Sequence, residues 1–108
     1  MSARPLIRRA LADRDIAGAV KYYLTEAGQG AAEGFLDAVE LAFRQIAEFP
    51  ETGSSRYAQE LVISGLRSWP LIRYPWLVLY VADESRVEVW RVLHGHRDIP
   101  AGLLEIAG

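Results

Sequence analysis

The sequence contains no cysteine, only one lysine and no long apolar run, and each of these absences limits what the protein can be. Without thiols the chain forms neither disulfides nor zinc sites built on sulfur. No segment approaches the roughly 18 consecutive apolar residues of a membrane span. The N-terminal stretch MSARPLIRRA lacks the apolar core of a signal peptide. We therefore expect a soluble, cytoplasmic protein that does not bind membranes.

Chain length and net charge limit the number of domains and the kinds of partner that we expect. The chain has 108 residues, which predicts a single domain over residues 1–108. Its formal net charge is −2, whereas proteins that bind nucleic acid usually carry excess Lys and Arg, so we expect no sequence-specific nucleic-acid binding. Lys21 is the only lysine among the 12 basic residues. Arginine suits forked contacts with carboxylates in protein interfaces, although a GC-rich genome also produces such a composition.

The first half of the chain predicts two helices. From about Ala10 to Glu26, apolar residues recur at steps of three and four, and the same period returns from about Ala31 to Phe49. Gly28 and Gly30 provide a short turn between the two helices, and Pro50 ends the second. Helices joined by so short a turn lie antiparallel.

The second half of the chain predicts strands. After an exposed connection over residues 50–59, three segments are rich in Val, Leu, Trp and Tyr: Leu66 to Ile72, Pro75 to Ala82 and Arg86 to His94. Residues Pro5 to Arg9 are a candidate edge strand. In the last strand, alternation places Val87, Val89, Arg91 and Leu93 on one face.

This order of elements predicts an α+β fold. The helical hairpin packs on one face of a small, mainly antiparallel sheet of three to four strands, and the opposite face is left without cover from the same chain. Trp69, Trp76 and Trp90 lie in the predicted strands. Core packing is the simplest explanation for any one of these tryptophans. With three of them in so small a sheet, we expect at least one to lie at a surface that binds a protein.

The stretch RVLHGHRDIP, Arg91 to Pro100, admits three interpretations. His94, His96 and Asp98 alternate and could chelate a metal, but Gly95 disfavours continued extension and no distant fourth ligand is evident. His94 could act as a general base with Arg97 holding a phosphate. Arg91 and Asp98 could instead form structural ion pairs or hydrogen bonds that fix the end of the strand. We expect no metal, no cofactor and no catalytic residue.

Three motifs carry a resemblance to a known family. They are EFPETG (Glu48 to Gly53), GLRSWP (Gly65 to Pro70) and RVLHGHRD (Arg91 to Asp98). In this order and spacing, over about Pro5 to Ile99, the chain resembles the ParE toxins of bacterial type II toxin-antitoxin systems, within the RelE/ParE superfamily. The resemblance implies a toxin that acts on DNA gyrase without chemistry of its own. It also implies a hetero-oligomer in which a ParD-like antitoxin neutralises the toxin.

RelE toxins share this fold but cut messenger RNA in the ribosome, and this activity remains an alternative. A nuclease needs cations to hold phosphate, together with an acid and a base. The candidates are Arg67, Arg73, Tyr74, Arg91, His94 and Arg97. The net negative charge disfavours this alternative, since affinity for polyphosphate grows with the number of cationic contacts. A third possibility is an inactive relative that only binds the antitoxin.

The resemblance also implies where the partners bind. In ParE-like proteins the end of the last strand and the following tail are implicated in toxicity, which makes Arg91, His94, Arg97 and Asp98 the candidates for contact with gyrase. Antitoxins of this class lay a helix and an extended segment over the toxin. The candidate antitoxin-binding residues are Tyr57, Trp69, Arg73, Trp76 and Tyr80. His96 and Trp90 depart from the common pattern, so the details of contact differ here.

Overall fold

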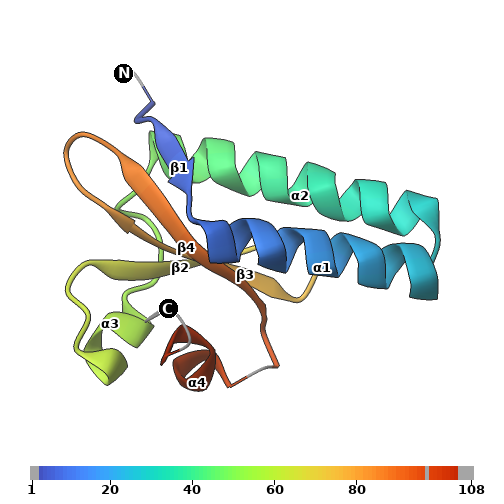
Figure 1. The fold of residues 1–108 in the computed structure, drawn as a ribbon. Coiled ribbons are helices and arrows are strands. Elements are labelled where there is room, and N and C mark those ends of the chain that lie inside the picture. The colour runs from blue at the N-terminus through green and yellow to red at the C-terminus, as the bar shows by residue number, and fades with distance from the viewer. Residues whose placement is uncertain (1–2, 97, 105–108) are drawn as a thin grey trace.

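The computed structural model describes residues 3–96 and 98–104. Two long antiparallel helices lie over one side of a four-stranded sheet, and two short helices lie on its other side (Figure 1). The α+β architecture predicted from the sequence is therefore confirmed. In chain order the elements are β1 (Leu6–Arg8), α1 (Ala10–Glu26), α2 (Gln29–Glu48), α3 (Arg56–Leu61), β2 (Leu66–Pro70), β3 (Trp76–Ala82), β4 (Val87–His94) and α4 (Ile99–Leu104).

The helical hairpin follows the predicted periodicity. The bounds of α1 match the prediction, and α2 begins at Gln29, two residues before the expected start. The turn is made by Gly28, whose φ of 96° is a conformation that glycine adopts without a steric penalty. Phe35, Val39 and Ile46 form the buried stripe of α2 against the sheet. Among the described helices, none has the length and apolarity required to span a bilayer.

The sheet has the strand order β1-β4-β3-β2. The pairs β2–β3 and β3–β4 are antiparallel, whereas the short edge strand β1 runs parallel to β4. The candidate strand at the N-terminus is thus confirmed, and the long connection between β1 and β4, which contains three helices and two strands, permits their parallel pairing.

A bulge in β4 changes which side chains share a face. Leu79 pairs with Arg91 but Tyr80 pairs with Val89, so Trp90 is one extra residue in the ladder. Val89 and Val92 therefore pack against the helical hairpin, while Leu93 packs on the other side of the sheet. The predicted alternation through Val89 and Leu93 is wrong because a bulge interrupts the two-residue period.

The second face of the sheet is covered by α3 and α4, which the sequence did not predict. Tyr57 of α3 and both Ile99 and Leu103 of α4 are buried in a cluster with Leu79 and Leu93. The expectation that this face lacks cover from its own chain is wrong. The segment expected to be an exposed connection contains Ser54, whose backbone bridges Ser68 of β2, and continues into α3.

Candidate functional site

Arg91 is the centre of the polar cluster at the end of β4, and it is buried, with 3% of its surface exposed. Its Nε and Nη2 donate to the two carboxylate oxygens of Asp15 on α1 at 2.7 and 2.8 Å, and its Nη1 donates to the carbonyl of Gly102 in α4 at 2.7 Å. Asp15 also accepts the backbone N–H of Val92 at 3.0 Å. The guanidinium thus joins α1, β4 and α4.

This burial contradicts the expectation that Arg91 contacts a target directly. It agrees with the alternative in which Arg91 forms structural interactions at the end of the strand. The forked geometry is the one that arginine and a carboxylate favour, and acceptors on two neighbouring elements, α1 and α4, take these hydrogen bonds. We therefore expect that removing Arg91 would loosen the attachment of α1 and α4 to the end of β4, whatever its effect on a partner.

His94 is half-buried and lies beside Trp76, with ring centroids 5.3 Å apart. Its Nδ1 accepts the backbone N–H of His96 at 3.2 Å, which leaves the proton of a neutral ring on Nε2. Asp98 is exposed, and its carboxylate accepts the backbone N–H of Ala101 at 3.2 Å at the start of α4. Arg97 lies outside the described residues. Within the described residues, no three His, Cys, Asp or Glu side chains gather as metal ligands would.

A groove of about 520 Å³ lies between α1 and the end of β4. Its walls hold Tyr22, with 58% of its surface exposed, and Trp76, whose Nε1 donates to the hydroxyl of Tyr23 at 2.9 Å. The remaining lining comes from Arg14, Asp15, Gly18, Ala19, Val92 and His94. Sequence reasoning missed Arg14, Gly18 and Tyr22. Their spacing of four residues puts them on one helical face, but nothing in the sequence links that face to β4.

The five residues predicted to bind the antitoxin do not form one surface. Tyr57 and Trp69 line the same pocket of about 560 Å³ beside the edge strand β2. Arg73 is exposed, with a φ of 69°, on the loop between β2 and β3, and Trp76 lines the separate groove beside α1. The pocket at β2 is completed by Thr52, Gly53, Ser54, Arg56, Ser68, Pro70, Ile72 and Leu77.

Tyr80 is a core residue and cannot contact an antitoxin in this structure. None of its surface is exposed, and its hydroxyl donates to the carbonyl of Pro50 at 2.7 Å. Burial raises the pKa of Tyr80 above its usual value, and a backbone hydrogen bond at Gly53 and the charge of Arg67 partly oppose that rise. We therefore remove Tyr80 from the antitoxin surface.

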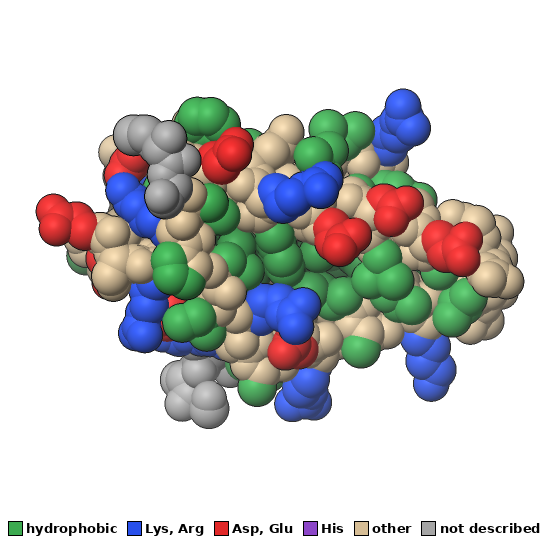
Figure 2. Space-filling model, turned by 90° about the horizontal axis from the view of Figure 1, so that it is seen from above, with side chains coloured by type: hydrophobic (Ala, Val, Ile, Leu, Met, Phe, Trp, Pro, Cys, Tyr) green, Lys and Arg blue, Asp and Glu red, His purple; other side chains and the backbone are tan. Residues whose placement is uncertain are grey.

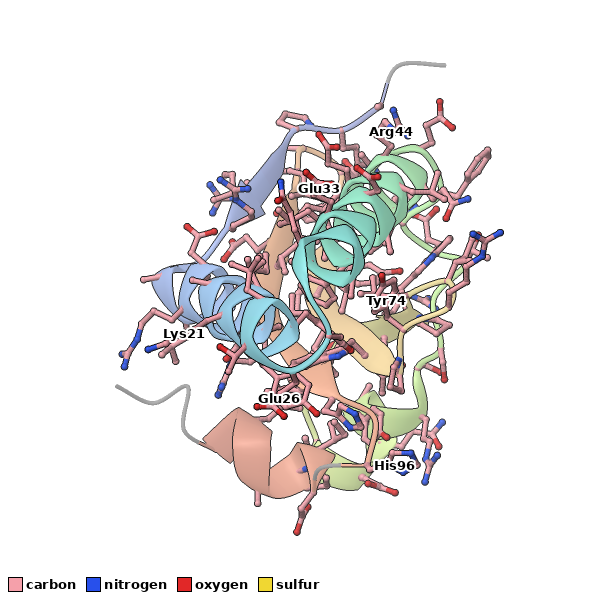
Figure 3. The ribbon with its side chains drawn as sticks, turned by 90° about the vertical axis from the view of Figure 1, so that its right-hand side faces the viewer. Lys21, Glu26, Glu33, Arg44, Tyr74 and His96 are labelled. Atoms are coloured by element: carbon pink, nitrogen blue, oxygen red, sulfur yellow. The ribbon has the colours of Figure 1, made fainter. Side chains whose placement is uncertain are left out.

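Two further residues in the nuclease inventory have structural partners. Arg67 donates to the carbonyl of Gly53 at 2.7 Å, and the hydroxyl of Tyr74 donates to the carbonyl of Ala31 at 2.9 Å. Figure 3 shows Tyr74 beside α2, on the opposite side of the molecule from Lys21. Together with Arg91, these residues hold loops and helices in place, and they do not converge on one cavity with His94.

Comparisons with known proteins place the chain in a family. The family model described as the ParE toxin of the type II toxin-antitoxin system parDE matches residues 6–99. No curated protein matches the sequence. A solved structure described as the chromosomal ParDE system from P. aeruginosa aligns with a TM-score of 0.71 and 15% identity, covering 85% of this chain and 96% of that chain. At this identity the structural likeness concerns the fold, and the family model spans most of the sequence. The protein belongs to the ParE toxin family of type II toxin-antitoxin systems.

Proposed function

We propose that this toxin blocks DNA gyrase by binding to it, performs no chemistry of its own, and is neutralised by a ParD-like antitoxin. Membership of the ParE family supports the choice of target and of antitoxin. The buried pair of Arg91 and Asp15 is the structural observation that carries the non-catalytic part of the proposal. An arginine that is fully occupied by a carboxylate and a helix carbonyl is not available to stabilise charge on a phosphate.

The remaining candidates do not supply a nuclease site either. Arg67 and Tyr74 donate to backbone carbonyls, and Arg73 lies at a different cavity from His94. Cleavage of RNA requires a base, an acid and cations around one phosphate, within hydrogen-bonding reach. The net charge of −2 also disfavours a polyanionic target.

We place the contact with gyrase at the groove between α1 and β4 and at the tail that follows it. His94 from the original prediction lies in this groove, together with Arg14 and Tyr22. Asp98 remains a candidate for contact with gyrase because it lies at the start of α4, in the tail that follows the groove. Arg97 remains a candidate on the sequence argument alone. Tyrosine and arginine side chains are enriched among the interface residues that contribute strongly to binding, and this groove is lined by one of each on α1.

We place the antitoxin at the pocket beside β2. Trp69 and Tyr57 present aromatic rings to this pocket, and Arg56 on its rim lies over the Tyr57 ring, 5.3 Å from the centroid. Apolar anchors with a nearby cation suit a segment that carries apolar and acidic side chains. Arg73 extends this surface along the neighbouring loop.

The test combines two readouts of the toxin without its antitoxin. Supercoiling of relaxed plasmid by purified gyrase and the integrity of cellular messenger RNA are measured together. We expect supercoiling to fall, cleaved DNA to accumulate and messenger RNA to stay intact. Cleaved messenger RNA with normal supercoiling would overturn the proposal in favour of a RelE-like nuclease. Absence of both effects would identify an inactive relative that only binds the antitoxin.

Two matched substitutions test the contact surface. Tyr22 and Phe49 are aromatic, lie on different sides of the molecule and have 58% and 56% of their surfaces exposed. We expect Tyr22→Ser to weaken inhibition of gyrase and Phe49→Ser to leave it unchanged, with both variants folded by circular dichroism. Equal inhibition by the two variants contradicts the assignment of the groove. For the antitoxin, we expect Trp69→Ala to reduce complex formation, measured by isothermal titration calorimetry.

A further inference from the structure

A hollow of about 410 Å³ lies between α2 and the loop that joins β2 to β3. Ala38 and Leu41 line its helix wall, and Ile72, Arg73 and Tyr74 line its loop wall. Ile72 projects from the loop with 52% of its surface exposed. An exposed isoleucine at the rim of a hollow is apolar surface that a binding partner would cover.

The loop wall of this hollow is fixed on α2. The hydroxyl of Tyr74 donates to the carbonyl of Ala31 at 2.9 Å, and its ring packs edge-on against Phe35 with centroids 5.7 Å apart. Gly34 leaves room for this ring, because a Cβ there would collide with the Tyr74 hydroxyl. Figure 3 shows Tyr74 beside α2, on the side of the molecule away from Lys21. A surface that is fixed before binding loses little conformational freedom when a partner docks.

Arg73 is held in an unusual backbone conformation. Its φ is 69°, in the left-handed region that glycine adopts without a steric penalty and that long side chains rarely adopt. Residues held in such a conformation cluster at binding sites and active sites. An arginine at a position that favours glycine indicates that its guanidinium takes part in a contact.

The two walls of the hollow carry opposite charges that the described residues leave unpaired. Asp37 projects from α2 and Arg73 from the loop, and both side chains are exposed. Neither forms an ion pair or a side-chain hydrogen bond within residues 3–96 and 98–104. The hollow therefore has one acidic wall and one basic wall, and no net charge.

We infer that this hollow binds a second copy of the chain in a symmetric dimer. A two-fold axis through the hollow places Arg73 of each copy opposite Asp37 of the other, because both side chains line the same depression. The same rotation brings the exposed Ile72 of each copy to the helix wall of the other, at Leu41. One arrangement thus satisfies both unpaired charges and covers the exposed isoleucine twice.

The charges argue against other occupants. An acidic segment would pair with Arg73 but would be repelled by Asp37, and a basic segment would meet the reverse. A polyanion needs several cationic contacts, whereas this hollow offers one. The face of the molecule seen in Figure 2 likewise carries both acidic and basic side chains, with hydrophobic ones between them. A second copy presents both charges in the required reversed order.

The experiment measures the mass of the full chain by sedimentation velocity, without antitoxin, because Ile72 and Arg73 also border the surface proposed for the antitoxin. We expect the average mass to rise from 12.1 kDa towards twice that value between roughly 1 and 500 µM, with a dissociation constant of about 10–100 µM. A chain that stays monomeric at the highest concentration overturns the inference.

Charge-reversed variants locate the interface. Arg73→Asp and Asp37→Arg each place like charges across the two-fold axis, so each variant alone is expected to dimerise at least tenfold more weakly. An equimolar mixture of the two variants restores both ion pairs and is expected to form a heterodimer. Lys21→Asp and Glu26→Arg, at exposed positions of α1, change the net charge equally and are expected to dimerise as the parent chain does.

The apolar contact is tested separately, in case a charge-reversed variant fails to fold. Ile72→Ser is expected to weaken the dimer about tenfold, whereas Val62→Ser, at a valine with 91% of its surface exposed, is not. A dimer that tolerates both charge reversals and Ile72→Ser overturns the inference, as does a mixture of folded reversed variants that fails to associate. These measurements contain no gyrase, so their outcome is separate from that of the supercoiling assay.

Discussion

The pair formed by Arg91 and Asp15 is expected to be the most sensitive polar contact in the fold. Only 4% of the Arg91 side chain and 12% of the Asp15 side chain are exposed. Asp15→Ala removes the carboxylate that accepts three hydrogen bonds, two donated by the guanidinium of Arg91 and one by the backbone N–H of Val92. Breaking a buried pair from one side costs about 3–5 kcal/mol, because the remaining charge is left without a partner. For a chain of 108 residues, that cost lowers Tm by roughly 13–22 °C.

The surface pair Arg8–Asp13 provides the matched control. Its side chains are 54% and 52% exposed, and exposed pairs contribute about 0–1 kcal/mol. Urea denaturation of Asp15→Ala and Asp13→Ala therefore gives a direct comparison on one helix. The reasoning fails if the free energies of unfolding of the two variants differ by less than about 1 kcal/mol.

A double substitution separates structure from function at the same site. Replacing Asp15 by Leu and Arg91 by Met together removes both charges and fills the space, so its cost is expected to be well below the sum of the single costs. If this folded double variant still inhibits gyrase, Arg91 acts through the fold alone. A folded double variant without inhibition would mean that Arg91 contributes directly to target contact.

Three further outcomes are expected. Gly18→Phe adds a large side chain to the lining of the groove between α1 and β4, at a position where a Cβ would meet no described atom within 4 Å apart from its chain neighbours and the nearby backbone of its own helix. A Cβ at Gly30 would also meet no described atom within 4 Å, but Gly30 does not line this groove, so Gly30→Phe is the matched control. We expect Gly18→Phe, but not Gly30→Phe, to weaken inhibition of gyrase in the supercoiling assay. Gly53→Ala is expected to cost about 1–3 kcal/mol in urea denaturation, because a Cβ there would clash with the buried hydroxyl of Tyr80 and meet the Ser68 carbonyl at 3.0 Å. Since burial raises the pKa of Tyr80, its stabilising contribution is present below the unfolded value of about 10 and is lost as pH rises through the folded value. Tyr80→Phe should therefore lower Tm at neutral pH and reduce the further loss of stability as pH rises above about 10.

The two long helices could be predicted from the sequence because their apolar period extends over many turns. The bounds of α1 match, and the start of α2 was misplaced only because Gly30 was read as part of the turn. The short helices α3 and α4 have six residues each, which is too short for a period to be recognised. The bulge at Trp90 left no signal either, because neither glycine nor proline marks it.

The candidate site was harder to predict because its contacts span the chain. Asp15 and Arg91 lie 76 residues apart, and nothing local connects them. A signal was nonetheless available in the sequence VWRVL: an arginine flanked by apolar residues in a central strand is buried only when a carboxylate accompanies it. That reasoning predicts a paired Arg91, although it does not identify Asp15 as the partner.

Two of the three family motifs, EFPETG and GLRSWP, help to hold the loop after α2 against β2 and β3. Pro50 and Gly53 of EFPETG accept hydrogen bonds from Tyr80 and from Arg67 of GLRSWP, and Ser54 pairs with Ser68 through the backbone. Residues that make these hydrogen bonds are constrained by the fold and cannot vary to suit a particular partner. Discrimination between partners requires positions that the fold leaves free. The pocket beside β2 and the groove between α1 and β4, with their exposed aromatic and cationic side chains, offer such positions. We therefore expect partner choice to depend on residues other than those that identify the family.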